Sequence, residues 1–262
     1  MLLDVMLVTT AARVSSIPEL PVVEGVRYII SVQDHEAALS PDELKALYRS
    51  DVQLRIYYDR GLSVNRNHAL EASSADIVMV ADDDLIFHPE GLRDLIKLYE
   101  QNPDIDWITT RAGLSEARVY PPDGWDLQRV FRHYVPVSFE LSFRRTSLPV
   151  GFRFSPLAGI GAPYLGAGED DLVYFHARRA GLRGVYKNIK VVTHPSATTN
   201  VRSASQIPVV RAKGALLRIM RGVFPGLIRI PVEAYRSPLS FGKAFVALTQ
   251  GYIYASTHKD QL

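Results

Sequence analysis

The chain has 262 residues, enough for one large domain or for a domain with an extension. Hydrophobic residues make up 47% of it and charged residues 22%, a composition typical of a soluble globular protein. Because it contains no cysteine, it can form neither disulfides nor thiolate metal sites, and a metal ion would need oxygen or imidazole ligands.

The net charge of +2 is unevenly distributed. Residues 201–262 carry nine Lys and Arg against two acidic residues, a net charge of +7, which leaves −5 for residues 1–200. The asymmetry indicates two functional regions.

The first residues, MLLDVMLVTT, have no basic segment and carry Asp4 early, so they are predicted as a strand and not as a signal peptide. No apolar stretch reaches the roughly 18 to 20 residues that a bilayer span requires. The cytoplasm is the expected compartment.

Short apolar runs alternate with helical patterns through the first half of the chain. Runs rich in β-branched residues are typical of buried parallel strands, and four are predicted: 3–10, 26–33, 52–58 and 76–81. Helices are expected at 40–50, 63–73 and 88–103, with Ser40 and Ser63 as possible N-caps of the first two. Such alternation predicts a parallel α/β sheet, in which ligands bind outside the carboxyl ends of the strands.

The second half is less regular. A strand is predicted at 135–145, and the glycine-rich segment 151–171 is expected to be an ordered loop over a site. A helix at 170–181, ending at Gly181, and a strand at 185–195 follow.

Asp82, Asp83 and Asp84 directly follow the strand at 76–81. Adjacent carboxylates repel one another, and partial burial adds to the free energy needed to ionise each one. Oxygen ligands at a strand end suit a hard divalent cation such as Mg²⁺ or Mn²⁺. The alternatives are a solvated acidic loop or charges that favour the N-terminus of the helix after Pro89.

The segment GLSVNRNHALEASSAD (61–76) leads into that strand. Gly61 and Ser63 are predicted to form a tight turn into a helix whose N-terminus can face a diphosphate, and Arg66 in its first turn could neutralise phosphate charge. The alternative is an amphipathic helix with an exposed arginine.

Glu169, Asp170 and Asp171 form a second acidic cluster at the start of a predicted helix. The helix dipole favours carboxylates there, so they could be simple capping acids. One of them could instead be a general base held close to a substrate. His194, at the end of the last predicted strand, is either structural or a metal ligand beside the aspartates.

In two blocks the chain resembles the GT-A-fold glycosyltransferases, specifically the inverting, family 2-like group. GLSVNRNHALEASSADIVMVADDD (61–84) is similar to the family's Gly-x-Ser-x-x-Arg-Asn helix that runs into a strand and a D-x-D motif. GAGEDDLVYFHARRAG (166–181) is similar to its Glu-Asp motif, and VVTHPSATT (191–199) completes the resemblance. One departure is Gln33-Asp34-His35, where the family has Asp-Asp-Gly-Ser.

The resemblance implies an α/β, Rossmann-like GT-A fold with a mixed, mainly parallel sheet flanked by helices. This catalytic domain would cover residues 1–200, with nucleotide-sugar binding over about 1–110 and the acceptor side over about 111–200. A basic, mostly helical C-terminal extension would follow at 201–262.

The resemblance also implies roles for single residues. Asp82 and Asp84 would bind a divalent Mn²⁺ or Mg²⁺ ion together with the diphosphate and ribose, and His194 would help to hold the metal. Asp170, with Glu169 beside it, would be the base that deprotonates the acceptor hydroxyl. The remaining nucleotide-sugar-binding residues would be Thr9, Asp34, Arg66 and Asp83.

A UDP-sugar is the expected donor, and a glycan or lipid-linked acceptor in polysaccharide or glycolipid biosynthesis is the expected partner. Two other functions are open. A sugar-1-phosphate nucleotidyltransferase would carry a Gly-rich basic loop after its first strand, where TTAARVSSIPEL (9–20) has one arginine and no glycine. A nucleic-acid-binding module would leave both acidic clusters unexplained, so nucleic acid is not an expected partner.

The basic extension contains RAKGALLRIMRGVFPGLIRI (211–230), with Leu216, Leu217, Met220 and Phe224 at helical spacing. This pattern predicts a helix that either packs on the catalytic domain or lies on an anionic membrane, peripherally at its inner face.

Overall fold

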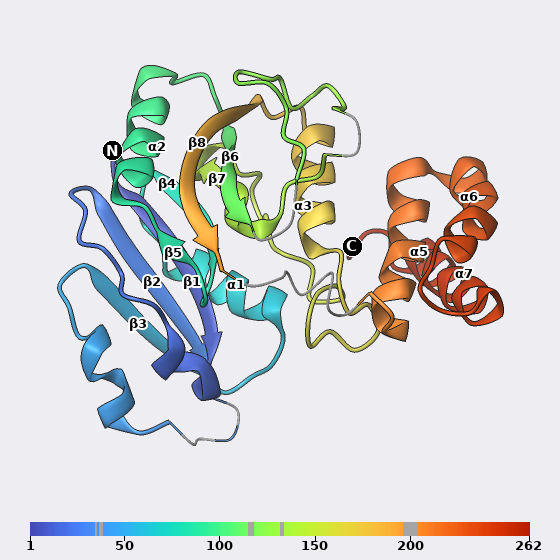
Figure 1. Ribbon diagram of the computed structural model, residues 1–262, viewed down its shortest axis with the longest axis horizontal. Helices are drawn as coiled ribbons and strands as arrows, with labels where there is room; N and C mark the ends of the chain where they lie inside the picture. The colour runs from blue at the N-terminus through green and yellow to red at the C-terminus, as the bar shows by residue number, and fades with distance from the viewer. Residues whose placement is uncertain (35, 37–38, 115–117, 132–133, 196–203) are drawn as a thin grey trace. The chain divides into compact units, whose positions relative to one another are not determined.

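The structure of the protein is a computed structural model that describes residues 1–34, 36, 39–114, 118–131, 134–195 and 204–262 (Figure 1). The chain divides into two units. The first contains residues 1–60, 64–153 and the described residues from 176 onward to 195, and the second contains 61–63, 154–175 and the described residues beyond 203. The predicted boundary at residue 200 lies outside the described residues, and the second unit also contains residues 154–171 of the glycine-rich loop.

The first unit is built on a sheet of β1 (Leu3–Thr10), β2 (Val26–Gln33), β3 (Val52–Tyr57), β4 (Ile77–Asp82), β5 (Ile86–Phe87), β6 (Trp107–Leu114), β7 (Leu141–Arg144) and β8 (Gly184–His194). Their order in the sheet is β3-β2-β1-β4-β7-β6-β8-β5 (Figure 1). The first four are parallel, β7 is antiparallel to both its neighbours, β8 is parallel to β6, and β5 is antiparallel to β8. The predicted mixed, mainly parallel sheet is confirmed.

The register of the parallel strands brings their carboxyl ends to one edge. Thr10 of β1 pairs with Gln33 of β2, and Gln33 with Tyr57 of β3. On the other side of β1, Val8 pairs with Asp82, the last residue of β4. The loops that follow β1, β2 and β4 therefore leave the sheet beside one another, as ligand-binding loops do in such folds.

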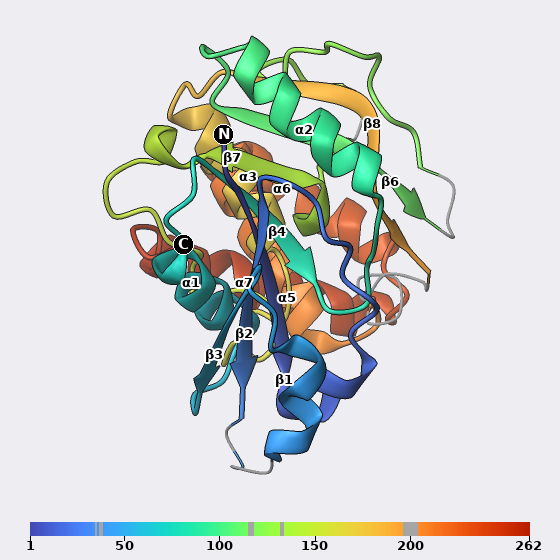
Figure 2. The same ribbon diagram turned by 90° about the vertical axis from the view of Figure 1, so that its left-hand side faces the viewer.

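Helix α2 (Pro89–Gln101) covers part of this sheet against β8 (Figure 2). It buries an apolar stripe of Leu92, Leu95, Ile96 and Tyr99 at helical spacing. A Cβ atom added at Gly91 would lie 2.1 Å from the carbonyl oxygen of Lys190, so only glycine lets the helix approach β8 this closely. Helices α1 (Leu62–Ala72) and α3 (Glu169–Arg179) fall where the sequence predicted helices.

Some predicted elements differ from the structure. The helix expected at 40–50 is a 3-10 helix, η2 (Pro41–Leu47), whose buried Leu44 and Leu47 have the three-residue spacing of that helix type. The strand expected at 135–145 is reduced to β7, because a 3-10 turn, η3 (Ser138–Glu140), precedes it.

Strand β6 was not predicted. Its sequence, WITTRAGL, breaks the apolar run with Thr109 and Thr110, although both threonines are buried.

The second unit contains α5 (Ile207–Arg221), α6 (Val223–Tyr235) and α7 (Phe241–Thr257), so the prediction of a mostly helical extension is correct (Figure 1). The single helix predicted over 211–230 is wrong, because Gly222, at φ 81°, ends α5 and begins α6. A Cβ atom at Gly214 would lie 2.0 Å from the carbonyl oxygen of Leu248, and one at Gly251 would lie 1.8 Å from that of Arg211. These glycines let α5 and α7 pack with their backbones close together.

The glycine-rich loop belongs to the same unit, because Ala158 and Leu165 share an apolar cluster with Ala212 of α5 and Ala255 of α7. Among the described residues, no helix has the combination of length and apolar character that crossing a bilayer would require.

Candidate active site

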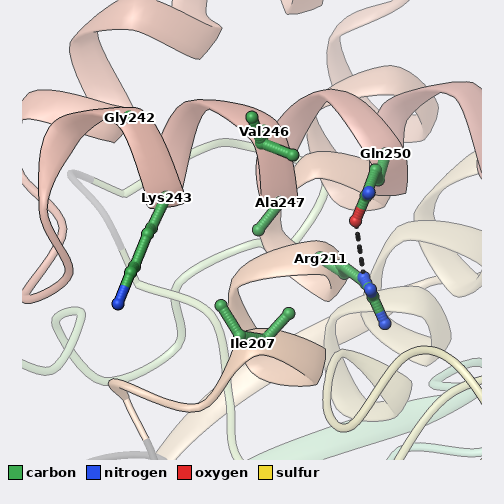
Figure 3. A pocket seen from close by; sticks show the side chains of 7 residues that line it. All are labelled: Ile207, Arg211, Gly242, Lys243, Val246, Ala247 and Gln250. Carbon is green, nitrogen blue, oxygen red and sulfur yellow. Dashed lines mark hydrogen bonds between the residues drawn. The ribbon is translucent and has the colours of Figure 1, made fainter.

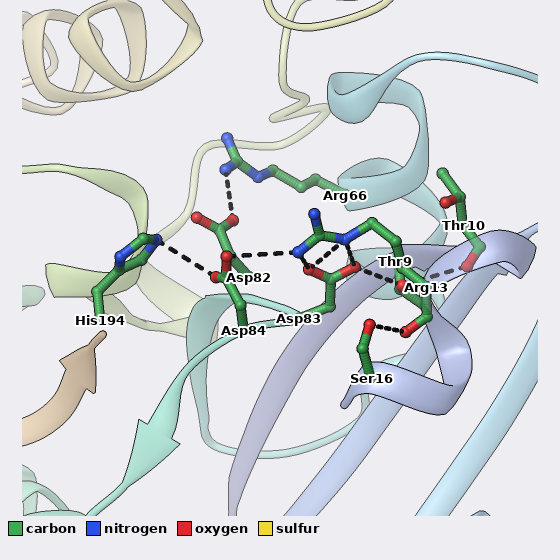
Figure 4. Close-up of polar contacts among 9 residues, drawn as sticks. All are labelled: Thr9, Thr10, Arg13, Ser16, Arg66, Asp82, Asp83, Asp84 and His194. Atoms are coloured by element: carbon green, nitrogen blue, oxygen red, sulfur yellow. Dashed lines mark hydrogen bonds and ion pairs between the residues drawn. The ribbon is translucent and has the colours of Figure 1, made fainter. Parts of the chain in front are cut away.

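The three adjacent aspartates lie where β4 ends and turns toward β5 (Figure 4). Asp82 closes the strand, and Asp83 and Asp84 form the turn, which we call the acidic turn (Asp82–Asp84). Asp83 is buried, and its Oδ2 accepts a 2.5 Å hydrogen bond from Oγ1 of Thr9, near the end of the adjacent strand β1. Two residues of the predicted site, Thr9 and Asp83, are thus brought together from neighbouring strands.

Arg13, which the sequence did not identify, also reaches the acidic turn. It lies in η1 (Ala11–Ser16), the 3-10 helix that follows β1. Its Nε donates to Oδ2 of Asp83 at 2.8 Å, and its Nη2 lies 2.5 Å from Oδ1 of Asp83 and 3.3 Å from Oδ2 of Asp84 (Figure 4). The hydrogen bond to Asp83, strengthened by the nearby carboxylate charges and opposed by burial, raises the pKa of Arg13. A fixed positive charge therefore balances part of the repulsion that adjacent carboxylates create.

Arg66 enters the site from α1. Its side chain is 1% exposed, and its Nη2 lies 3.3 Å from Oδ1 of Asp82 (Figure 4). The alternative of an exposed arginine on an amphipathic helix is therefore wrong, since Arg66 is buried against the acidic turn. Ser63 is not the N-cap of α1, because it lies within the helix and its hydroxyl donates to the carbonyl oxygen of Ala158 at 2.7 Å.

Asn65, a second residue that the sequence did not identify, ties α1 to the strand ends. Its Nδ2 donates to the carbonyl oxygens of Thr9 and Ser31 at 3.0 and 3.1 Å, and its Oδ1 accepts from the Ser31 hydroxyl at 2.5 Å. All three residues are buried. Asn65 therefore fixes where β1 and β2 end relative to the helix that carries Arg66.

His194 ends β8 and is buried with its ring stacked on Phe139, at a centroid distance of 5.3 Å. Its Nε2 lies 3.3 Å from Oδ1 of Asp84, which is itself buried and accepts no hydrogen bond from the described residues (Figure 4). The two predicted metal ligands His194 and Asp84 are therefore adjacent, although about 110 residues separate them in sequence.

The described residues contain no group of three or more His, Asp or Glu side chains arranged to hold a metal ion. Three groups at the acidic turn could contact such an ion. They are Oδ1 of Asp84, which accepts no hydrogen bond from the described residues, Nε2 of His194, and the carboxylate of Asp82, which is paired with Arg66. Carboxylate and imidazole donors suit a divalent ion such as Mn²⁺ or Mg²⁺. This part of the acidic turn is chemically compatible with such an ion.

Asp34 follows β2 and is buried. Its Oδ2 accepts a hydrogen bond from the backbone N–H of Leu39 at 3.1 Å. The neighbouring His35 lies outside the described residues. The predicted role of Asp34 in nucleotide-sugar binding stays a prediction.

The second acidic cluster begins α3 in the second unit. Glu169 is buried, whereas Asp170 and Asp171 are half-buried. Gly159, at φ +104°, packs against this end of the helix, because a Cβ atom there would lie 3.1 Å from Oγ of Ser63 and 3.2 Å from Oε2 of Glu169. The glycine-rich loop therefore comes close to Glu169.

Burial, together with the negative charge of Asp170, raises the pKa of Asp171 to about 6, and Lys213 of α5 opposes the shift. A carboxylic acid with this pKa can exchange a proton near neutral pH. Glu169 and Asp171 are therefore not freely solvated.

A model of glycosyl transferase family 2 matches residues 27–161, just over half of the chain. No curated protein matches the chain in sequence. In fold, it is similar to residues 1–349 of S. aureus TarS in complex with UDP-GlcNAc, with a TM-score of 0.58 at 14% identity over 98% of this chain and 73% of that chain. For the complex of the same protein with UDP the TM-score is 0.57, again at 14% identity, over 98% and 72% of the two chains.

Proposed function

The chain belongs to glycosyl transferase family 2 and is a glycosyltransferase that uses a nucleotide-sugar donor; on that premise we propose that it is metal-dependent and inverts the anomeric centre of the sugar. The observation that supports this most strongly is the acidic turn. Each carboxylate of this turn contacts a residue from another element of the fold: Asp83 contacts Thr9, Asp82 contacts Arg66, and Asp84 contacts His194. The family match favours transfer over the alternative of a sugar-1-phosphate nucleotidyltransferase.

The proposed donor is a UDP-sugar, bound by Thr9, Asp34, Arg66, Asp82 and Asp83. S. aureus TarS has been crystallised with UDP-GlcNAc and with UDP, and its fold is similar to the fold of this chain. The buried guanidinium of Arg66 supplies positive charge beside the acidic turn, where a diphosphate would otherwise be repelled.

We further propose that Asp82, Asp84 and His194 turn toward a divalent ion, Mn²⁺ or Mg²⁺, when it binds, since the three side chains are not arranged around one in this structure. The buried Oδ1 of Asp84, which accepts no hydrogen bond from the described residues, supports this assignment. When bound, such an ion stabilises the negative charge that develops on a leaving diphosphate. The chain itself orients these side chains. Arg13 fixes the acidic turn through its hydrogen bond to Asp83, and Phe139 stacks on the imidazole ring of His194.

The proposed general base is Asp170, with Glu169 beside it. A hydroxyl group is a weak nucleophile and needs a carboxylate within hydrogen-bond reach to accept its proton as it attacks. Attack on the face of the sugar opposite the diphosphate inverts the anomeric centre. The burial of Glu169 against Gly159 supports this role, because it fixes the first turn of α3 and hence the position of Asp170.

The proposed acceptor is a glycan or a lipid-linked molecule in polysaccharide or glycolipid biosynthesis. The net charge of +7 over residues 201–262 supports peripheral contact with the inner face of an anionic membrane, where a lipid-linked acceptor would lie. The enzyme would then act from the cytoplasm.

A thermal-shift panel of nucleoside diphosphates, each with and without Mn²⁺, tests the proposal. We expect UDP to raise the Tm only when the metal is present, and Asp84→Ala to abolish this shift. Asp42→Ala, which removes an exposed carboxylate on η2, is the matched control and should keep it. A metal-independent shift of equal size in the wild-type protein and in Asp84→Ala would contradict the metal assignment while leaving nucleotide binding intact.

A further inference from the structure

Helix α6 is apolar on both of its faces. Gly226, Ile230 and Ala234 are buried at four-residue spacing against α5 and α7. On the opposite side, Phe224 is 76% exposed and Ile228 is 73% exposed. Large apolar side chains exposed together on one side of a helix normally mark a surface that binds a partner, so the exposed face of α6 needs one.

Further exposed apolar side chains lie along the same side of α6, and the next helix begins with two more. Leu227, Val232 and Tyr235 are also exposed, and Tyr235 ends α6. After a short connection, Phe241 and Phe245 begin α7, both exposed and stacked at a centroid distance of 5.9 Å. We call the exposed side chains of Phe224, Leu227, Ile228, Val232, Tyr235, Phe241 and Phe245 the apolar face.

Cations flank the apolar face in sequence. Arg221 precedes α6 and Arg236 follows it, and both are exposed. Lys243, also exposed, lies on the side of α7 that faces α5. The acid of α6, Glu233, is paired with Arg229 at 2.9 Å and with Arg236 at 3.7 Å. The described part of the extension therefore presents apolar side chains with an excess of positive charge around them, which is complementary to a surface that is apolar inside and anionic outside.

A groove between α5 and α7, of about 570 Å³, has the same chemistry. Ile207, Val246 and Ala247 line it with apolar surface, and Figure 3 shows Lys243 and Arg211 toward its opposite ends. Arg211 is oriented by a 3.0 Å hydrogen bond from its Nε to Oε1 of Gln250 (Figure 3). The groove therefore adds apolar surface flanked by cations to the same unit.

We propose that the apolar face is a docking surface for a phospholipid bilayer rich in anionic lipid. The inference deepens the proposed membrane contact of the extension and rests on it. Helix α6 has 13 residues, which span about 20 Å, whereas the hydrocarbon core of a bilayer is about 30 Å thick. The helix therefore lies along the membrane surface, with its apolar side chains among the lipid tails and Arg221 and Arg236 at the level of the phosphates.

Co-sedimentation of the full chain with two kinds of vesicle tests the proposal. One kind is phosphatidylcholine alone, and the other is phosphatidylcholine mixed with phosphatidylglycerol. We expect the wild-type protein to partition preferentially to the mixed vesicles. The double variant Phe224→Ser/Ile228→Ser should lower the partition coefficient more than tenfold. The triple variant Arg221→Gln/Arg236→Gln/Lys243→Gln should remove the preference for anionic lipid.

The matched control is Val22→Ser/Val150→Ser, which removes two exposed apolar side chains of the first unit and should bind vesicles like the wild-type protein. Equal binding by the wild-type protein and Phe224→Ser/Ile228→Ser would overturn the proposal, as would failure of the wild-type protein to bind. If the wild-type protein is oligomeric without lipid and the double variant is monomeric, the apolar face is an interface between copies of the chain, and the proposal is wrong.

The UDP-induced thermal shift separates this inference from the proposed catalytic function. The double variant should retain that shift, because α6 carries no residue of the proposed active site. Retained nucleotide binding with unchanged vesicle binding would refute the docking surface alone. A wild-type protein that binds vesicles but shows no shift with any nucleotide would refute the donor assignment alone.

Discussion

Arg13 forms a bidentate hydrogen bond with the carboxylate of Asp83, with Nε 2.8 Å from Oδ2 and Nη2 2.5 Å from Oδ1. A planar guanidinium matches a carboxylate in this two-point arrangement, which fixes orientation as well as charge. The contact joins the 3-10 helix after β1 to the turn after β4, 70 residues away. Arg13 also lies 3.3 Å from Oδ2 of Asp84, whereas Asp82 is paired with Arg66.

Arg13→Ala should weaken UDP binding by about tenfold in the presence of Mn²⁺, because the acidic turn loses the contact that aligns it. Since Arg13 is half exposed, the free energy of unfolding should fall by only about 1 kcal/mol. Isothermal titration calorimetry and urea unfolding measure the two effects. Arg13→Lys keeps the positive charge but cannot form the bidentate hydrogen bond, so it should not restore the affinity for UDP. Wild-type affinity in this variant would show that the charge alone supports binding.

Asn65→Ala should destabilise the fold by about 2–4 kcal/mol, because it leaves the buried carbonyl oxygens of Thr9 and Ser31 without this amide donor. Asn65→Asp keeps the acceptor for the Ser31 hydroxyl but lacks the amide donor, so it should lose a similar amount. Urea unfolding measures both. A loss below about 0.5 kcal/mol in either variant would show that the strand ends do not depend on this side chain.

Asp170→Asn should keep the UDP-induced thermal shift and lower the rate of sugar transfer by at least about a hundredfold, the usual contribution of a general base. Release of UDP in the presence of acceptor measures the rate. Asp260→Asn, at an exposed position of the same unit, is the control and should transfer at the wild-type rate. Substantial residual turnover in Asp170→Asn would assign the base to another residue.

Asp171 should make the protein less stable as the pH rises. Because burial and the charge of Asp170 raise its pKa from 3.8 to about 6, the folded state binds a proton more tightly than the unfolded state does. This group's destabilising effect is absent below the unfolded pKa of 3.8, develops between 3.8 and about 6, and is complete above that, at about 1–3 kcal/mol.

Asp171→Asn should therefore flatten the dependence of unfolding free energy on pH over this interval and stabilise the protein at neutral pH. Urea unfolding at a series of pH values measures it. Asp170→Asn should act in the same direction but less, because it removes only the smaller cause of the shift. A pH profile that neither variant changes would contradict the raised pKa.

Much of the fold follows from local pattern. The β-branched runs of β1 to β4 and the apolar stripe of α2 are periodic signals that one segment carries by itself. Strand β6 was not predicted because Thr109 and Thr110 interrupt the apolar pattern. Both are buried in the structure, where β6 lies between β7 and β8. The prediction of a single helix at 211–230 was wrong because Gly222, with a positive φ, separates α5 from α6.

The sequence by itself determined, through its resemblance to a known family, the class of enzyme and which acidic residues to consider, because motif spacing is a local property of the chain. Only the tertiary structure decided which side chains meet. It placed His194 beside Asp84, buried Arg66 against Asp82, and brought Arg13 to Asp83. The physical reason is that such contacts depend on strand order and register, and these are set by how the whole sheet buries its apolar faces.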